Sequence, residues 1–325
     1  MSKRQQTIMT YMLSKSLFFG LGISYCMSNA RQNSWLAIIL GYLLGLIILN
    51  FLMKRKLSNI CQDWWGKIIF LLLISMMLLN AIIAYSAQVI NFYLPSTPAI
   101  VIALTFLAMM IYGLSKDIGT LGRATELALY TGVLILIIGI GGNIKNWDLA
   151  NFGPLLYNLN WSFFKAVIAV SAYSLAPTIL LMMHEDNLDK KSIILGYLLS
   201  ALVSFLIVFS TVATLGVTLS AAYRYPEYTA FKKINALNFL ERIENILAFM
   251  WLVDIAFLGI LSGLGLKKCF KLKWAIIISI IAVLSTIYLF INIYQNALFV
   301  YHNSIYGIWL IIGILMITRK KESTL

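Results

Sequence analysis

The stretch Ser171-Ala172-Tyr173-Ser174-Leu175-Ala176-Pro177 interrupts an otherwise apolar run at residues 161–183. A second interruption, Gly20-Leu21-Gly22, lies near the middle of the apolar run at residues 10–29. Proline removes a backbone donor and glycine weakens a helix, so each stretch predicts a break inside an apolar helix. About half of the chain separates the two breaks, so the rest of the sequence decides whether they are related.

The composition around these breaks is that of a membrane protein. Of the 325 residues, 61% are hydrophobic and 11% are charged, and the mean hydropathy is +0.88. Soluble domains are about a quarter charged, so a water-soluble globule is excluded. A helix needs roughly 20 apolar residues to cross a bilayer, and about ten such runs leave no room for a separate soluble domain. We therefore expect one all-α polytopic membrane domain over residues 1–325, with apolar runs at 10–29, 35–53, 67–93, 98–114, 124–142, 161–183, 192–219, 237–265, 273–291 and 302–318.

The basic residues lie between the apolar runs, so the net charge of +13 indicates membrane topology rather than nucleic-acid binding. With a cytoplasmic N-terminus, seventeen Lys and Arg residues fall in the inside segments and five fall outside. The positive-inside rule therefore predicts that both termini are cytoplasmic and that loops 30–34, 143–160 and 220–236 lie outside.

Five runs in each half make an odd number, so the second half has to enter the membrane from the opposite side. The sequence thus predicts two inverted repeats, residues 1–142 and 161–318, with matching breaks in the first and sixth helices. Such breaks free backbone N–H and C=O groups at mid-depth, as in transporter-type sites. The alternative is that the glycines serve close packing and that the proline only kinks its helix. The candidate ligand-binding residues are Gly20, Gly22, Tyr173, Ser174 and Pro177.

Residues 225–257 carry the most specific motif of the chain. Pro226 in an outer loop precedes the pattern Phe239-x-Glu241-Arg242-x-Glu244, which Trp251 and Phe257 follow. This pattern resembles the endospore germination permeases, the membrane B subunits of nutrient germinant receptors. Two weaker stretches agree with the resemblance, Arg123-Ala-Thr-Glu126 and Asn151-Phe-Gly-Pro154.

The resemblance implies a fold and a function. That family belongs to the amino acid–polyamine–organocation superfamily, which implies an inverted five-plus-five helix fold with broken first and sixth helices. It further implies binding of a small nutrient, expected to be an amino acid, within a receptor complex that includes a larger membrane subunit and a lipoprotein in the spore inner membrane. Two alternatives stay open, a free-standing proton- or sodium-coupled amino acid transporter and a scaffold with a vestigial site.

Charged residues within the apolar runs require an explanation. Placing a charged side chain at membrane depth costs at least about 2.5 kcal/mol unless the charge is paired or hydrated. Glu241, Arg242 and Glu244 open the eighth helix near the outer surface, where acids suit a helix N-terminus. We expect a structural role for them, with ligand contact as the alternative. In the fold that the resemblance implies, Lys15 and Glu126 are neighbours near the cytoplasmic side and can form an inner-gate ion pair. Snorkelling to the headgroups accounts equally well for Lys15.

Asp254 lies near the middle of the eighth helix with no obvious basic partner at the same depth. An unpaired carboxylate there should be protonated, hydrated or bound to a cation, because desolvation disfavours its charged form. In the implied fold this helix passes close to the first-helix break, which makes Asp254 a candidate proton or cation site. The alternative is a polar contact that holds two helices together.

Other polar residues are less informative. Asn80, Tyr85 and Gln88 of the third run can line a cavity or serve as interhelical hydrogen-bond partners. The chain has two histidines and three widely separated cysteines, and it shows no catalytic triad and no phosphate-binding glycine loop. We therefore expect no enzyme activity, no metal site and no cofactor.

Overall fold

The computed structural model of the protein describes residues 1–54, 57, 64–154, 156, 159–184, 188–233, 243–270, 272–292 and 294–317. These residues form helices joined by turns, and no strand occurs among them. Seven helical segments are long and apolar enough to cross a membrane, and Ala99–Leu114 and Lys273–Leu289 are shorter apolar helices. The prediction of a multi-pass helical membrane protein is confirmed.

The helices follow the order of the predicted runs. The first half contains α1 (Lys3–Ser16), α2 (Leu21–Ala30), α3 (Ser34–Met53), α5 (Trp64–Phe92), α6 (Ala99–Leu114) and α7 (Ile118–Asn143). The second half contains α8 (Trp161–Ser174), α9 (Thr178–His184), α10 (Lys190–Ala222), α11 (Pro226–Phe231), α12 (Ile243–Cys269), α13 (Leu272–Asn292) and α14 (Tyr294–Ile317). Short 3-10 helices lie between the longer helices as η1 (Arg31–Asn33), η2 (Ile144–Asn146) and η3 (Leu149–Phe152).

The first break separates α1 from α2 at residues 17–20. Gly20 has φ 79° and ψ −110°, a conformation that glycine adopts at little cost and other residues rarely adopt. The N–H groups of Phe18 and Phe19 donate to the Lys15 carbonyl at 3.0 and 3.1 Å, which closes the end of α1. The Tyr301 hydroxyl of α14 donates to the Leu17 carbonyl. The break is therefore a defined turn in which the Lys15 and Leu17 carbonyl groups have partners.

The second break separates α8 from α9 at residues 175–177. Proline disfavours helical geometry in the residue before it, and α8 ends at Ser174, three residues before Pro177. The Ser174 hydroxyl donates to the Ser171 carbonyl at 2.9 Å and lies 2.6 Å from the Tyr197 hydroxyl. Because α9 begins directly after Pro177, no hydrogen bond within α9 requires an N–H group from this residue.

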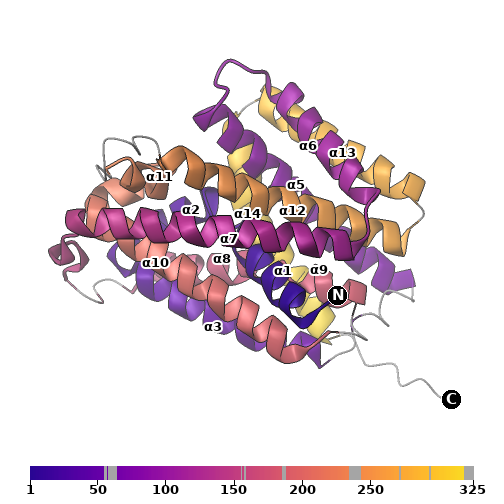
Figure 1. The fold of residues 1–325 in the computed structure, drawn as a ribbon, viewed down its shortest axis with the longest axis horizontal. Helices are drawn as coiled ribbons and strands as arrows, with labels where there is room; N and C mark the ends of the chain where they lie inside the picture. Colours follow the sequence, from indigo (N-terminus) through magenta and orange to yellow (C-terminus); the bar gives the residue numbers. More distant parts are fainter. Residues whose placement is uncertain are drawn as a thin grey trace.

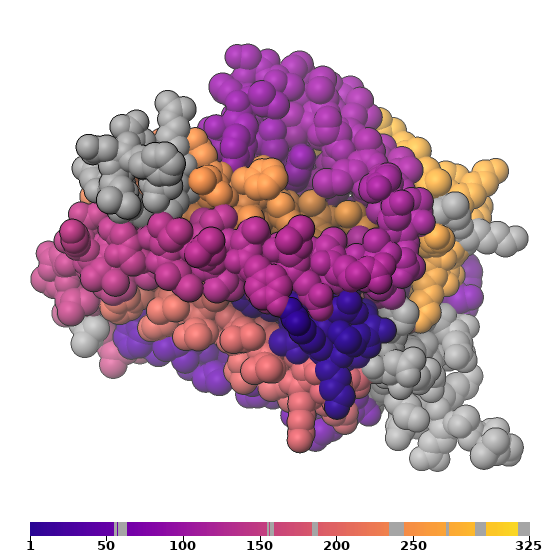
Figure 2. All heavy atoms as spheres, in the orientation of Figure 1, coloured from indigo at the N-terminus to yellow at the C-terminus, as the bar shows by residue number. Residues whose placement is uncertain are grey.

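The two broken helices lie in the interior of the bundle. α1 packs against α10, α12 and α7, and α2 packs against α8. Figure 1 shows α7 crossing the molecule between α12 and α10. In the space-filling view of Figure 2, α7 forms a continuous ridge over this face, and its large side chains are well exposed, with Leu127 at 70% and Ile137 at 65%. An exposed apolar face of this kind suits contact with lipid.

Candidate functional site

The two breaks meet at Gly22 and Tyr173. A Cβ atom on Gly22 would stand 3.2 Å from Cδ2 of Tyr173 and 2.9 Å from the Leu17 carbonyl oxygen. The Tyr173 hydroxyl donates to the Tyr301 carbonyl at 3.3 Å, and Tyr301 itself donates to Leu17. A tyrosine of α14 thus connects both broken helices, and glycine at position 22 allows the second half-helix to approach α8 closely.

The other predicted ligand residues have separate surroundings. Ser174 hydrogen-bonds within α8 and to Tyr197 of α10, and neither partner belongs to the first broken helix. Pro177 lies in the turn before α9. The structure therefore brings Gly22 and Tyr173 into contact, while Ser174 faces α10.

Gly20 meets two polar side chains from distant parts of the chain. Its N–H donates to Oε1 of Glu227 at 2.9 Å, and Glu227 is fully buried on α11. A Cβ on Gly20 would stand 2.5 Å from Nε2 of Gln88, a buried residue of α5. The sequence pointed to Gln88 but not to Glu227, because no local pattern shows that residue 227 is buried. The acid directly after Pro226 was the only indication that this loop carries a special residue.

Burial raises the pKa of Glu227 to about 8. Loss of hydration is the main cause, and backbone N–H groups of Glu227 itself and of Gly20 oppose it in part. The α11 helix lies outside the apolar spanning segments, yet it carries this carboxyl group to the first break. Burial therefore makes the charged form of this carboxyl group less favourable than it is in water.

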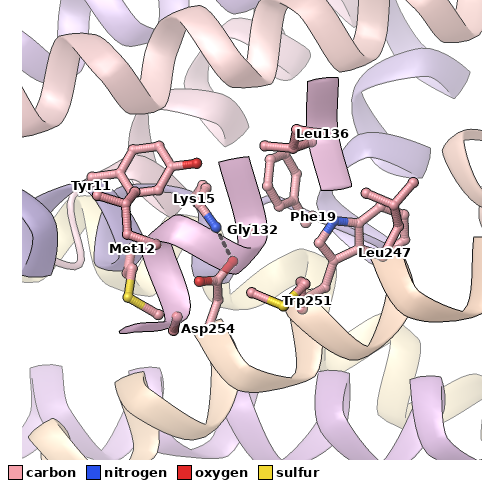
Figure 3. Close-up of a pocket in the computed structure, with 12 residues that line it drawn as sticks. Tyr11, Met12, Lys15, Phe19, Gly132, Leu136, Leu247, Trp251 and Asp254 are labelled. Atoms are coloured by element: carbon pink, nitrogen blue, oxygen red, sulfur yellow. Dashed lines mark hydrogen bonds and ion pairs between the residues drawn. The ribbon is translucent and has the colours of Figure 1, made fainter. Parts of the chain in front are cut away.

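Lys15 of α1 forms a buried ion pair with Asp254 of α12. The side chains are 7% and 3% exposed. The prediction that Asp254 has no basic partner was therefore wrong. The reason is that α1 packs against α12, so the last turn of α1 carries Lys15 to the middle of α12. Figure 3 shows the two charged groups pointing toward each other.

Glu126 has a different partner from the one predicted. Its carboxylate lies 3.8 Å from Nε of Arg4, and the two side chains are 25% and 59% exposed. The predicted Lys15–Glu126 pair was therefore wrong. Arg4 lies in the first turn of α1 and reaches α7, whereas Lys15 lies three turns further along α1.

A small cavity borders the Lys15–Asp254 pair. Its volume is about 20 Å³, and Phe19, Gly132 and Trp251 contribute to its wall. A cavity of this size holds about one water molecule. The Lys15 ammonium also lies 5.2 Å from the centre of the Phe19 ring, close enough for a cation–π interaction. The pair is thus shielded from bulk solvent but has room for one hydrating molecule.

The structure describes some of the other polar residues that the sequence singled out. Glu244 is buried in the first turn of α12. Glu241 and Arg242 lie outside the described residues. Asn80 and Ser304 hydrogen-bond to each other at 2.7 and 3.0 Å, which is the interhelical role rather than the cavity-lining one.

A model of the family described as spore germination protein matches residues 4–300 of this chain. Spore germination protein A2 of Bacillus subtilis (strain 168) is 26% identical over 264 residues, which cover 74% of this chain and 72% of that protein. Spore germination protein KB of the same organism is 23% identical over 256 residues, which cover 70% of this chain and 68% of that protein.

A solved structure is also similar. The manganese transporter of Eremococcus coleocola, crystallised with an aromatic bis-isothiourea compound, aligns with a TM-score of 0.54 at 12% identity. The alignment covers 96% of this chain and 77% of the transporter. At this identity the likeness concerns the fold alone.

Proposed function

Because the chain belongs to the spore germination protein family, we propose that it is the integral membrane subunit of a germinant receptor and binds a small nutrient, an amino acid in the simplest case. The family match over residues 4–300 supports the receptor role. The ligand would lie at the first- and sixth-helix breaks, with Gly20, Gly22, Tyr173, Ser174 and Pro177 around it.

The observation that carries this proposal is the contact between the two breaks. Gly22 at the start of α2 and Tyr173 near the end of α8 touch, and both lie in the buried interior. Half-helix ends present free N–H and C=O groups and partial charges, which suit the ammonium and carboxylate groups of an amino acid.

In this proposal, the protein has ten spans in one membrane domain, and the spans are arranged as inverted repeats over residues 1–142 and 161–318. The matching order of broken and unbroken helices in the two halves and the likeness to a transporter fold support it. A larger membrane subunit and a lipoprotein would complete the receptor in the spore inner membrane. Both termini would face the cytoplasm.

The test is ligand binding by the purified protein in lipid nanodiscs. Thermal unfolding is followed with each of the twenty standard L-amino acids, and a binder at 100 times its Kd should add about 2.7 kcal/mol of stability. Gly22→Leu should remove this gain, because no room exists beside Leu17 and Tyr173.

Two further variants complete this test. Gly313→Leu is the matched control, since a Cβ on Gly313 would meet nothing within 4 Å. Gly22→Ala is the milder variant, and we expect it to fold and to bind more weakly. If Gly22→Ala bound the amino acid as tightly as the parent, the site would lie elsewhere. If the parent bound none of the twenty, the ligand class would be wrong.

The buried Lys15–Asp254 pair supports a second candidate, a proton- or sodium-coupled amino acid transporter. A titratable pair beside a water-sized cavity can take part in ion coupling, and Asp254 would be its proton or cation site. Uptake of labelled amino acid into proteoliposomes under an imposed proton or sodium gradient would favour this candidate. Binding without uptake would favour the receptor.

A further inference from the structure

Two buried polar side chains converge on the first helix break. Glu227 of α11 and Gln88 of α5 are both fully buried and both lie against Gly20. The Gly20 N–H uses one carboxylate oxygen of Glu227. The other oxygen, Oε2, and both amide atoms of Gln88 have no hydrogen-bond partner among the described residues. Two side chains with spare hydrogen-bonding capacity therefore meet at the proposed ligand site.

Unpaired polar groups at this depth of burial lower the stability of the ligand-free protein. Buried polar groups are nearly always hydrogen-bonded, and an unpaired one loses its hydration without replacement. Burial of the Glu227 carboxyl group has a larger free-energy cost than burial of the Gln88 amide. A structural role for Glu227 is also poorly supported, because α11 has other anchors. The Tyr228 ring stacks on Phe92 with centroids 4.1 Å apart, and its hydroxyl donates to Oδ1 of Asn245 at 2.7 Å.

We propose that Glu227 and Gln88 form the subsite that receives the ammonium group of the ligand, a step that rests on the proposed function. An ammonium group has three donors and a positive charge. Oε2 of Glu227 is a free acceptor, and the carboxylate supplies the opposite charge. Nε2 of Gln88 lies nearest Gly20, and rotation of this unpartnered amide would present Oε1 as a second acceptor. The bond from Gly20 to Oε1 holds the carboxyl group at the start of α2 while Oε2 binds the ligand.

The chemistry favours an ammonium group over a metal ion. Metal sites in proteins collect several ligating side chains, and the described residues contain no group of three or more His, Cys, Asp or Glu. One carboxylate beside one neutral amide instead matches a singly charged donor. Compounds with a primary amine should therefore bind, and the same compounds without it should not.

The experiment measures Kd in nanodiscs for the parent, Glu227→Gln and Gln88→Met. The probes are the standard amino acid that binds the parent most tightly, its des-amino carboxylic acid and its decarboxylated amine. Glu227→Gln should weaken amino acid binding by at least tenfold and bring its affinity close to that of the des-amino acid. Gln88→Met should also weaken binding, yet the ligand-free protein should melt at the same or a higher temperature, because unpaired polar atoms are removed.

Glu244→Gln is the matched control, since Glu244 is also a buried glutamate and lies in the first turn of α12. It should bind the probes like the parent. Equal affinity of parent and Glu227→Gln, or equal binding of the amino acid and its des-amino form, would overturn the subsite and leave the proposed function standing. A lower melting temperature of Gln88→Met would show that its amide is structural and overturn its part. Absence of amino acid binding by the parent would overturn both proposals.

Discussion

The Lys15–Asp254 pair joins two side chains 239 residues apart that have both lost their hydration. Desolvation of two charges offsets much of their attraction, so replacing a whole buried pair is often close to neutral. Removal of one partner is different, because it leaves an uncompensated charge in the bundle interior. The pair is therefore coupled in its effect on stability.

A double-mutant cycle tests this coupling. Lys15→Met and Asp254→Asn should each lower the free energy of unfolding by about 3–5 kcal/mol, and the double variant should recover most of the loss. Denaturant unfolding in detergent provides the measurement.

The same variants separate structure from ion coupling. A stable double variant that loses any dependence of the ligand response on pH or sodium would support a proton or cation role for Asp254. If Asp254→Asn matched the parent in stability, pH response and sodium response, neither the coupling nor the role would hold.

Sequence reasoning failed at this scale for a physical reason. Lys15 and Asp254 could be identified as residues with a high desolvation cost, because that cost can be read from the apolar run around each charge. Their pairing could not be predicted, because the depth of Lys15 depends on where α1 ends and on which helix α1 packs against. Glu227 was missed for the same reason, since its burial is set by how α11 folds over Gly20.

At the scale of elements, both breaks were predicted because glycine and proline act through local backbone chemistry. A third irregularity was not predicted. Gly216 inside α10 has φ 75° and ψ 167°, and the freed Ala213 carbonyl accepts from the Asp148 N–H and the Asn151 amide, both at 2.9 Å. A single glycine in an apolar run gives no signal of such a kink, because glycine is common in membrane helices and the groups that bond to the freed carbonyl lie in a loop about 65 residues earlier.

Gly216→Ala should therefore be destabilising. A side chain at positive φ is strained, and its Cβ would stand 3.1 Å from Oδ1 of Asn151, so we expect a loss of about 1–3 kcal/mol. Thermal unfolding in detergent measures the loss.

Gly141→Ala in α7 is the control for this variant. A Cβ there would meet nothing within 4 Å, so the change should be neutral or slightly stabilising through helix propensity. Equal melting temperatures for the two variants would contradict the role of Gly216.

At the scale of the whole molecule, hydropathy alone predicted the class of protein and the order of its helices. The number of membrane spans is harder to predict from hydropathy. The first break divides one apolar run into two helices, α1 with 14 residues and α2 with 10. Each piece is shorter than the roughly 20 residues that cross a bilayer. The inverted arrangement depends on pairing such pieces, which is a tertiary property.

Cysteine labelling tests the predicted orientation of the helices in the membrane. Single cysteines at Lys54 and Lys145, both exposed, are introduced in a background without Cys26, Cys61 and Cys269. We expect an impermeant thiol reagent added outside intact cells to label the cysteine at position 145 and to spare the one at 54, because the positive-inside rule places them on opposite sides. The reverse pattern would invert the whole arrangement.

The bond between Gly20 and Glu227 has a consequence for how the site evolves. Its donor is a backbone N–H, which every residue except proline would offer equally. Residue 20 is constrained by its own conformation and not by the identity of its acidic partner. Covariation between positions 20 and 227 among relatives should therefore be weak although the residues touch. Such a contact, which joins the short helix α11 to the interior of the bundle, should therefore leave little covariation signal among relatives.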